Sequence, residues 1–249
     1  MLDNTFIHCP GIGEKTERKI WESGVRTWQD VENGSPLPIS ELSHSLLLPI
    51  VQESIARLNA GDYKWFADKL PLREHWRTLQ HFRDRIVYLD IETTGGTGPD
   101  DVTVIGVYDG LTCDQFVAGR DLHLFEKYMS DRALIVTFFG TGFDIPMLKR
   151  AFGMEFSQLH IDLCFVLKRL GYKGGLKSIE QQLGMDRSDE TSGLGGWDAV
   201  RLWNLWQSGN EDALEILLRY NKEDVVNMEY LLEFAYAKML AAVGSAEIS

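Results

Sequence analysis

The chain has 249 residues, of which 44% are hydrophobic and 25% are charged, and this is the composition of a globular protein that can bury a substantial core. The formal net charge of −12 argues against a protein that coats nucleic acid with a basic surface, but it does not exclude an enzyme that meets nucleic acid through bound cations. No apolar run approaches the ~18 residues of a membrane span, no signal pattern begins the chain, and the three cysteines lack the spacing of a metal site. We therefore expect a cytoplasmic protein with no membrane partner.

Residues 1–80 predict a small all-α domain that begins with a glycine-rich turn. The run Pro10-Gly11-Ile12-Gly13 lies between two helical stretches, and it leaves backbone N–H groups free at the start of a helix over 16–23, where one phosphate could bind. With the trailing Gly-Val-x-Thr-Trp-x-Asp-Val segment, this turn resembles the helix-hairpin-helix motif of DNA-repair and replication proteins. The resemblance implies contact with a DNA backbone through Gly11, Ile12, Gly13 and Lys15, and a turn that serves only packing is the alternative.

Residues 34–80 are predicted to be mainly helical, and a group of ring-bearing side chains ends this region. His75, Trp76, His81 and Phe82 could stack on bases, but at helical spacing we favour a packing layer. The pattern changes from helical to strand-like over 78–84, which we interpret as the boundary between a helical domain over 1–80 and a second domain over 84–240. Residues 241–249 are expected to form a flexible tail.

The second domain opens with a short apolar strand that carries two acids. Ile86 to Leu89 is a β-branched and aromatic run, typical of a buried strand, and Asp90 and Glu92 continue it. Side chains at i and i+2 of a strand lie on one face, so the two carboxylates share one place and need a cation or a proton to neutralise them. For this pair alone, an exposed strand end with two solvated acids is the alternative.

The elements that follow alternate between strands and helices. Strands are predicted over 101–108, 115–117 and 133–139, with a hairpin turn at Asp109-Gly110, and helices over 122–130, 175–184 and 213–232. Asp144 follows a glycine-rich turn after the strand over 133–139 and precedes a helix, which places another carboxylate at a sheet edge. Together these elements predict an α/β fold with helices flanking the sheet.

Further polar residues lie at the ends or on one face of predicted helices. Tyr220 and Asp224 are at i and i+4 of the last helix and therefore on one face, although alone they could be a surface pair. Lys177 begins a helix and could touch a phosphate or remain solvated. Asp162 follows a short strand from Leu159, and it either supports a site together with His160 or caps the next helix.

In this order, Asp90-x-Glu92, Phe143-Asp144 and Tyr220-x-x-x-Asp224 resemble the DEDD exonucleases of the DnaQ-like, RNase H-like superfamily, and the tyrosine marks the DEDDy branch. The resemblance covers roughly residues 84–240 and implies an RNase H-like mixed sheet. One departure is Phe139, where relatives often have Asn. Several segments look most like the YprB-type ribonuclease H-like domains: Phe143-Asp144-x-Pro146, His160-x-Asp162-Leu163, Gly175-Leu176-Lys177-Ser178-Ile179-Glu180 and Tyr220-Asn221-x-x-Asp224.

The resemblance implies metal-dependent 3′–5′ exonuclease activity with two divalent cations, Mg²⁺ or Mn²⁺, roughly 3.5–4 Å apart. Such hard cations prefer oxygen ligands, which Asp90, Glu92, Asp144 and Asp224 provide. By similarity, Asp90 bridges both ions, Glu92 and Asp224 hold the ion that binds the attacking water, and Asp144 supports the other ion. Tyr220 would orient that water, because a phenol with a pKa near ~10 is mostly protonated.

The resemblance also implies a nucleic-acid partner. Thr93, Phe143 and Lys177 are expected to contact the strand, and His160 and Asp162 to support the metal ligands. The helix-hairpin-helix-like segment favours DNA over RNA, and we expect the strand to be single. Protein partners and the oligomeric state are not predicted.

Two other functions share some of these features. In the first, a catalytically idle exonuclease-like domain recruits nucleic acid or a partner through the N-terminal segment, but an idle site has no physical need to retain costly carboxylates. In the second, an endonuclease of the RNase H type uses the same acidic strand and two metal ions. The Tyr-x-x-x-Asp helix favours removal of nucleotides from a 3′ end instead.

Overall fold

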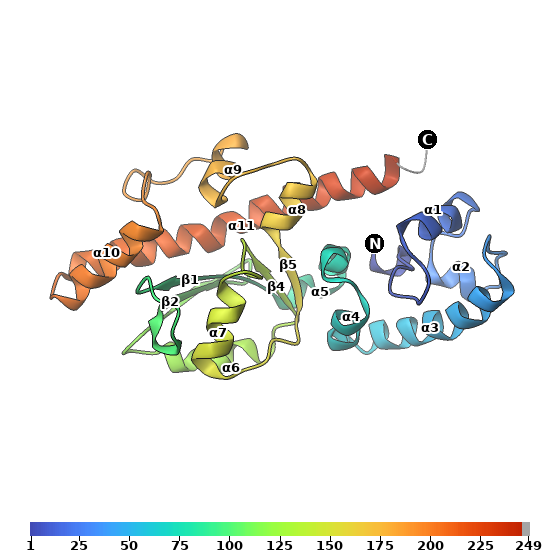
Figure 1. Cartoon of the computed structure of the whole chain (residues 1–249), viewed down its shortest axis with the longest axis horizontal. Helices are drawn as coiled ribbons and strands as arrows, with labels where there is room; N and C mark the ends of the chain where they lie inside the picture. Colours follow the sequence, from blue (N-terminus) through green and yellow to red (C-terminus); the bar gives the residue numbers. More distant parts are fainter. Residues whose placement is uncertain (246–249) are drawn as a thin grey trace. The chain divides into compact units, whose positions relative to one another are not determined.

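The computed structural model describes residues 1–245, and the chain divides into two compact units. The helical unit contains Met1–Asp84, Ser157–His160 and the chain from Tyr236 onward, and the sheet unit contains Arg85–Phe156 and Ile161–Ala235. Figure 1 shows the elements of both units, coloured along the sequence. Two short segments from the range 84–240 therefore group with the N-terminal helices.

Tertiary contacts explain this grouping. The backbone N–H of His160 donates to Nδ1 of His75 at 3.0 Å. The ring of Tyr236 packs edge-on against Trp76, with 5.9 Å between the ring centroids. Contacts between residues so far apart in the chain leave no signal in the local pattern from which a boundary is predicted.

The helical unit has the predicted all-α N-terminal part, and residues 1–84 contain no strand. Ser40 accepts a hydrogen bond from the N–H of Ser43 and caps the start of the longest helix of this part, a position that serine favours. His75, Trp76 and Phe82 are buried and His81 is half-buried, so the predicted packing layer is confirmed. The elements are a 3₁₀ turn (Leu2–Asn4), α1 (Glu14–Glu22), α2 (Trp28–Glu32), α3 (Glu41–Asn59), α4 (Tyr63–Lys69), a 3₁₀ turn (Leu72–Thr78) and α5 (Leu79–Phe82).

One helix rather than two flanks the N-terminal glycine-rich turn. Before Pro10 the chain forms only the 3₁₀ turn Leu2–Asn4 and irregular turns, so the expected first helical stretch is wrong. The cause is Glu17 of α1, whose carboxylate accepts from the Thr5 hydroxyl at 2.6 Å and from the Phe6 N–H at 2.7 Å. Side-chain acceptors of this kind compete with helical hydrogen bonds.

A buried ion-pair cluster lies within the helical unit. Arg77 donates to Glu74 at 2.7 Å and to Glu17 at 3.2 Å, and each of these side chains is at most 2% exposed. Burial raises the pKa of Glu17, and the charge of Arg77 offsets part of this effect. We call these three residues the Arg77 cluster, in which each buried acid contacts the cation.

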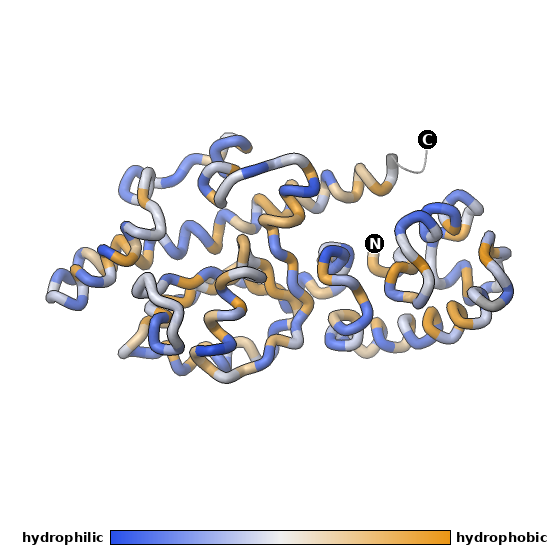
Figure 2. The backbone as a smooth tube through the Cα atoms, in the orientation of Figure 1, coloured by the Kyte–Doolittle hydropathy of each residue, from blue (hydrophilic) through white to orange (hydrophobic). Residues whose placement is uncertain are grey.

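The sheet unit contains a mixed five-stranded sheet in the order β3-β2-β1-β4-β5. β1 is antiparallel to β2 and parallel to β4, and β2 is antiparallel to β3, so the predicted mixed sheet is confirmed. Figure 2 shows that hydrophobic residues dominate the central strands. The strands are β1 (Ile86–Thr93), β2 (Val102–Tyr108), β3 (Cys113–Val117), β4 (Leu134–Thr137) and β5 (Leu159–Asp162).

Most of the predicted helices of this part are present, and α10 is an addition. Its start has a local signal, because the Asp198 carboxylate accepts from the Gly195 N–H at 2.9 Å three residues earlier. The last helix continues well beyond the predicted end, so residues 241–245 of the expected tail are helical and 246–249 lie outside the described residues. The helices are α6 (Phe125–Met129), α7 (Asp144–Phe152), α8 (Leu163–Arg169), α9 (Leu176–Gln182), α10 (Gly196–Gln207) and α11 (Glu211–Ser245). Within residues 1–245, no helix has both the length and the apolar character needed to cross a lipid bilayer.

The alternation along β1 gives its two faces different neighbours. Val87, Leu89 and Ile91 belong to a core with residues of α6 and α7. The opposite face of the sheet packs on α10 and α11 through Val104 of β2 and its neighbours, and Figure 1 shows α11 and α7 on opposite sides of the sheet. Asp90 and Glu92 alternate with the first group, so they lie on the side of α11.

Candidate active site

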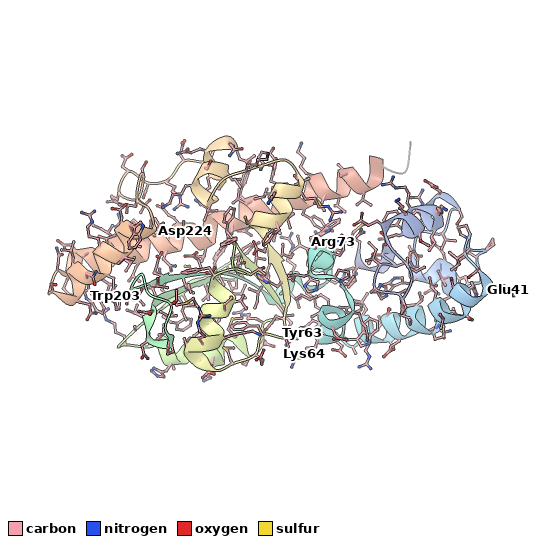
Figure 3. All side chains as sticks on the ribbon, viewed as in Figure 1. Glu41, Tyr63, Lys64, Arg73, Trp203 and Asp224 are labelled. Atoms are coloured by element: carbon pink, nitrogen blue, oxygen red, sulfur yellow. The ribbon has the colours of Figure 1, made fainter. Side chains whose placement is uncertain are left out.

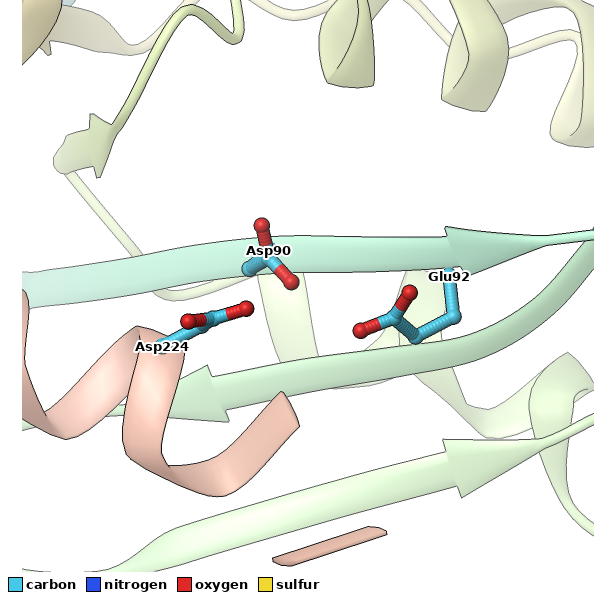
Figure 4. A group of neighbouring side chains, drawn as sticks. All are labelled: Asp90, Glu92 and Asp224. Atoms are coloured by element: carbon cyan, nitrogen blue, oxygen red, sulfur yellow. The ribbon is translucent and has the colours of Figure 1, made fainter. Parts of the chain in front are cut away.

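Three carboxylates meet between β1 and α11. Asp90 and Glu92 come from β1 and Asp224 from α11, and one oxygen of each lies within 4.8 Å of the other two. Figure 4 shows the three groups directed into one space, and Figure 3 labels Asp224 among all the side chains. Glu92 and Asp224 are buried and Asp90 is half-buried, so the alternative of a solvated strand end is wrong.

Asp144 is held beside this group by the end of the sheet. The parallel pairing of β1 with β4 stops at Tyr88 and Val136, and beyond it the Asp144 carboxylate accepts from the N–H of Ile91 at 3.1 Å. Asp144 is also the first residue of α7, where the helix dipole favours a negative charge. A helix start thus takes the place of a strand partner and brings the fourth predicted acid to the same strand.

Burial raises the pKa of all four carboxyl groups. The pKa values of Asp90 and Glu92 lie well above the ordinary range, because of burial first and the neighbouring negative charge of Asp224 second. Burial raises the pKa of Asp144 to about 7 and that of Asp224 to about 6. The group cannot carry four negative charges at neutral pH unless a cation compensates them.

Asn221 ties α11 to the sheet at this point. Its Nδ2 donates to Oδ2 of Asp90 at 3.0 Å, and its Oδ1 accepts from Gln115 of β3 at 3.0 Å. Gly106 lies opposite Asp90 in the β1–β2 register, and a Cβ there would come within 2.1 Å of Asn221 Oδ1. Glycine therefore permits the close approach of the helix. The sequence signal was a lone glycine inside a strand, which often marks such an approach.

Tyr220 and Lys177 form a hydrogen-bonded pair beside the carboxylates. Nζ of Lys177 donates to the Tyr220 hydroxyl at 2.6 Å and lies 3.9 Å from the ring centroid, and it also contacts the carbonyl of Leu194. Tyr220 is buried and Lys177 is half-buried, so the alternatives of a surface pair and a solvated lysine are wrong. Burial raises the pKa of Tyr220, which keeps the phenol protonated at neutral pH.

Arg187, in the loop between α9 and α10, was not predicted as a site residue. Its guanidinium lies 2.5 Å from Oδ1 of Asp224 and donates to both oxygens of Glu180 at 2.7 Å. Arg187 and Glu180 are buried, and burial opposes the pKa rise that Glu180 and Asp224 cause in Arg187. This contact neutralises part of the Asp224 charge and leaves its other oxygen available to a cation. A single arginine in an irregular loop carries no spacing from which this could be predicted.

Asp162 organises the turn between β4 and α7. Its carboxylate accepts from the N–H of Phe139 at 2.8 Å and of Thr141 at 3.0 Å. It also accepts from the N–H of Cys164 at 3.1 Å, so the predicted helix-cap role is confirmed. Among residues 1–245, Phe139 is the one non-glycine residue with positive φ, at 65°. Asn tolerates this conformation better than Phe does, which gives a physical reason for the Asn that the family resemblance leads us to expect at this position.

An open cavity of about 500 Å³ lies over the carboxylates. Its lining includes Tyr220 and the four acids, and also Thr93 and Phe143, two of the predicted strand contacts. Lys177 instead lines a neighbouring cavity of about 490 Å³. His160 falls in the helical unit, so its expected support of the metal ligands stays a prediction.

The N-terminal glycine-rich turn also belongs to the helical unit. Gly11, Gly13 and Lys15 are exposed, whereas Ile12 is buried and so serves packing. Gly13 precedes α1, whose first residue is Glu14, and an acid at this position opposes a bound phosphate. Contact of this turn with a DNA backbone stays a prediction.

The side chains at the carboxylate group fit a hard divalent cation. Asp90, Glu92, Asp144 and Asp224 offer only oxygen atoms, which Mg²⁺ and Mn²⁺ prefer. Oε1 of Glu92 is buried and accepts no hydrogen bond within residues 1–245. A buried carboxylate oxygen without a partner is costly, and a cation would satisfy it.

The family follows from the sequence match and the fold together. The chain belongs to the RNase H superfamily, whose model matches residues 87–236. The match begins in β1, ends in α11 and includes all four acids and Tyr220. The predicted RNase H-like fold is thereby confirmed.

Solved structures with related folds share little sequence with this chain. The family B DNA polymerase from the archaeon Pyrobaculum calidifontis is 21% identical with a TM-score of 0.46, and the match covers 63% of this chain and 24% of the polymerase. Brucella melitensis NrnC with bound Mg²⁺ is 23% identical with a TM-score of 0.42, covering 68% and 82% of the two chains. Escherichia coli RNase D, an exoribonuclease involved in structured RNA processing, is 16% identical with a TM-score of 0.43, covering 70% and 48%. This chain thus spans about a quarter of the polymerase and about half of RNase D. No curated protein sequence matches it.

Proposed function

We propose that this chain is a metal-dependent exonuclease that hydrolyses phosphodiester bonds from the 3′ end of a nucleic-acid strand. The observation that carries this proposal is the meeting of carboxylate oxygens of Asp90, Glu92 and Asp224 within 4.8 Å of one another, with Asp144 held on the same strand. Buried acids with raised pKa values are costly to a fold and cluster at functional sites. Two Mg²⁺ or Mn²⁺ ions, when bound, would supply an activated water and neutralise charge on the scissile phosphate.

The protein's own residues would position these components. The four carboxylates would hold the ions, and Asn221 would fix the Asp90 carboxylate through its hydrogen bond at 3.0 Å. Tyr220 would donate a hydrogen bond to the attacking water, because its raised pKa rules out a role as the base. Lys177 would orient the Tyr220 hydroxyl, which it contacts at 2.6 Å, and add positive charge toward the phosphate.

For the substrate, we propose single-stranded DNA in preference to RNA. The sequence of the N-terminal glycine-rich turn favours DNA through its resemblance to helix-hairpin-helix motifs, although one helix rather than two flanks this turn. The net charge of −12 disfavours contact with many phosphates along a duplex, so the few nucleotides at a strand end suit this chain better.

The test is digestion of 5′-labelled single-stranded DNA and RNA of one sequence with Mg²⁺, Mn²⁺ or EDTA. The wild type should produce a metal-dependent ladder that shortens from the 3′ end. Asp224→Ala should slow cleavage at least roughly 100-fold, because a metal ligand is lost. Asp212→Ala, an exposed acid at the start of the same helix, should cleave at the wild-type rate.

Two results would contradict the proposal. Normal cleavage by a correctly folded Asp224→Ala variant, or wild-type cleavage in EDTA, would remove the assignment of the site. No cleavage of either strand by the wild type, together with measurable binding, would identify a binding protein that keeps the fold without the chemistry. Thermal unfolding of each variant checks the fold.

A further inference from the structure

Three exposed aromatic side chains line the cavity over the carboxylates. Trp197 is 81% exposed, Phe139 50% and Phe143 38%. Large apolar side chains that gather on one exposed surface mark binding sites. Building on the proposed function, we propose that Trp197 is a base-stacking residue, assisted by Phe139 and Phe143, that holds an unpaired terminal nucleotide with its phosphodiester bond at the carboxylates.

One edge of the Trp197 ring packs against the backbone at the rim of the cavity. It is the second residue of α10, and a Cβ at Gly95 would lie 3.6 Å from Cζ3 of its ring. Gly95 has φ of +93° and belongs to the turn that follows Glu92 on β1. The turn after the two acids therefore supports one edge of the indole and leaves its surface to solvent. A base can stack on such a surface whatever its identity.

Phe139 is directed by a strained backbone. Its φ of 65° is unfavourable for a bulky residue, and the Asp162 carboxylate holds its N–H at 2.8 Å. The ring lies over Gly142, where a Cβ would meet Cζ of Phe139 at 2.8 Å, so a glycine is needed beneath it. Strain of this kind is typical of ligand-binding residues. Here it maintains a half-exposed phenyl ring at the cavity.

The charge of the cavity favours stacking over ion pairing as the source of strand affinity. None of the described residues that line the cavity is Lys or Arg, whereas four of them are acids: Asp90, Glu92, Asp144 and Asp224. Apart from bound cations and Lys177 behind Tyr220, the described residues offer no cation to a polyanion at this cavity, so we expect most of the strand affinity to come from the bases. Stacking needs unpaired bases, so a duplex end must open before it binds.

The test measures binding without cleavage, by fluorescence anisotropy in Mg²⁺. The ligands are two 5′-labelled single-stranded oligodeoxynucleotides whose terminal phosphodiester has a methylene in place of the bridging oxygen. They differ only in the last nucleotide, which has a base in one and is abasic in the other. The wild type should bind the base-bearing ligand roughly 5- to 100-fold more tightly, the usual strength of base stacking.

Trp197→Ala should lose that preference, so it should bind the abasic and base-bearing ligands with nearly equal affinity. Trp197→Phe should retain most of the preference. Leu111→Ala is the matched control, since Leu111 is 91% exposed at the β2–β3 hairpin. Its preference should equal that of the wild type. A Trp197→Ala variant with the wild-type preference would overturn the proposal, as would a wild type that shows no preference or no binding.

These two uncleavable ligands, used beside a cleavable strand of the same sequence, separate this proposal from the proposed function. A wild type that prefers the base-bearing ligand but leaves a cleavable strand intact would support stacking and contradict hydrolysis. A wild type that cleaves the strand but binds both ligands equally would contradict stacking alone. Thermal unfolding of Trp197→Ala, whose side chain is largely in solvent, should match the wild type.

Discussion

The two units bury charged groups in opposite ways. In the helical unit, the Arg77 guanidinium contacts both acids of its cluster, at 2.7 Å and 3.2 Å. In the sheet unit, four acids crowd the end of β1, and the nearest cation, Arg187, contacts Asp224 alone among them. The Arg77 cluster is closed to solvent, whereas the carboxylate group opens onto a cavity of about 500 Å³.

The difference distinguishes buried charges that are paired when the chain folds from buried charges that are left to bind a ligand. A buried acid that contacts a buried cation is satisfied when the chain folds, and removing the cation destabilises the protein. An acid left without a partner, such as Oε1 of Glu92, destabilises the folded chain until something outside it binds. The following predictions test whether the two clusters differ in this way.

The largest effect on stability is expected in the helical unit. Arg77→Ala removes the buried cation from Glu17 and leaves Glu74 with the exposed Arg73, 3.6 Å away, so it should lower the free energy of unfolding by about 3–5 kcal/mol. Urea denaturation and hydrogen exchange of the helical unit's amides would measure it. Arg57→Ala is the control, because this exposed arginine pairs with Glu53 and Asp62 on the surface, and its loss should change the free energy of unfolding far less. Equal losses in the two variants would mean that the Arg77 cluster does not stabilise the unit.

Lowering the pH should reduce the stability of the helical unit through protonation of His8. Burial lowers the pKa of His8 from 6.5 to about 4. As pH falls from 6.5 toward 4, the unfolded chain binds a proton that the folded chain does not, so stability is lost, by up to about 3 kcal/mol. His8→Gln should remove this part of the pH dependence of the unfolding free energy. Parallel pH profiles for the variant and the wild type would contradict this prediction.

The carboxylates of the sheet unit change the stability with pH in the opposite direction, so the contribution of His8 can be measured only by comparing His8→Gln with the wild type. Their pKa values are raised, to about 7 for Asp144 and about 6 for Asp224. The folded chain therefore binds protons before the unfolded chain does, and these groups gain stability as pH falls through that range. Burial also lowers the pKa values of His75 and His81 in the helical unit, so only the difference between His8→Gln and the wild type isolates the contribution of His8.

The smallest change in the free energy of unfolding is expected from metal binding. Mg²⁺ at about 100 times its dissociation constant should stabilise the wild type by about 2.7 kcal/mol, because the ion binds only the folded chain. Hydrogen exchange should locate this gain in the sheet unit, and EDTA should reverse it. In Asp224→Ala the gain should shrink, while Arg77→Ala should keep it. Equal stabilisation of the wild type and Asp224→Ala would place the bound ion elsewhere.

Local sequence patterns predict those features of this protein that depend on a few neighbouring residues. The apolar run before Asp90, the two-residue spacing to Glu92 and the four-residue spacing of Tyr220 and Asp224 place each side chain on a known face of its own element. The glycine-rich turn before Asp144 likewise indicated a carboxylate at a helix start. Each of these features depends on a few neighbouring residues, so a linear pattern is sufficient to predict it.

The tertiary structure alone decided which elements meet. It brought Asn221 to Asp90 across Gly106, placed Arg187 on Asp224, and set Trp197 against the turn at Gly95. It also joined Ser157–His160 to the helical unit. These contacts join residues that are distant in the chain, and packing of whole helices and strands brings them together. No local spacing reports such contacts, because the burial that drives them depends on the entire fold.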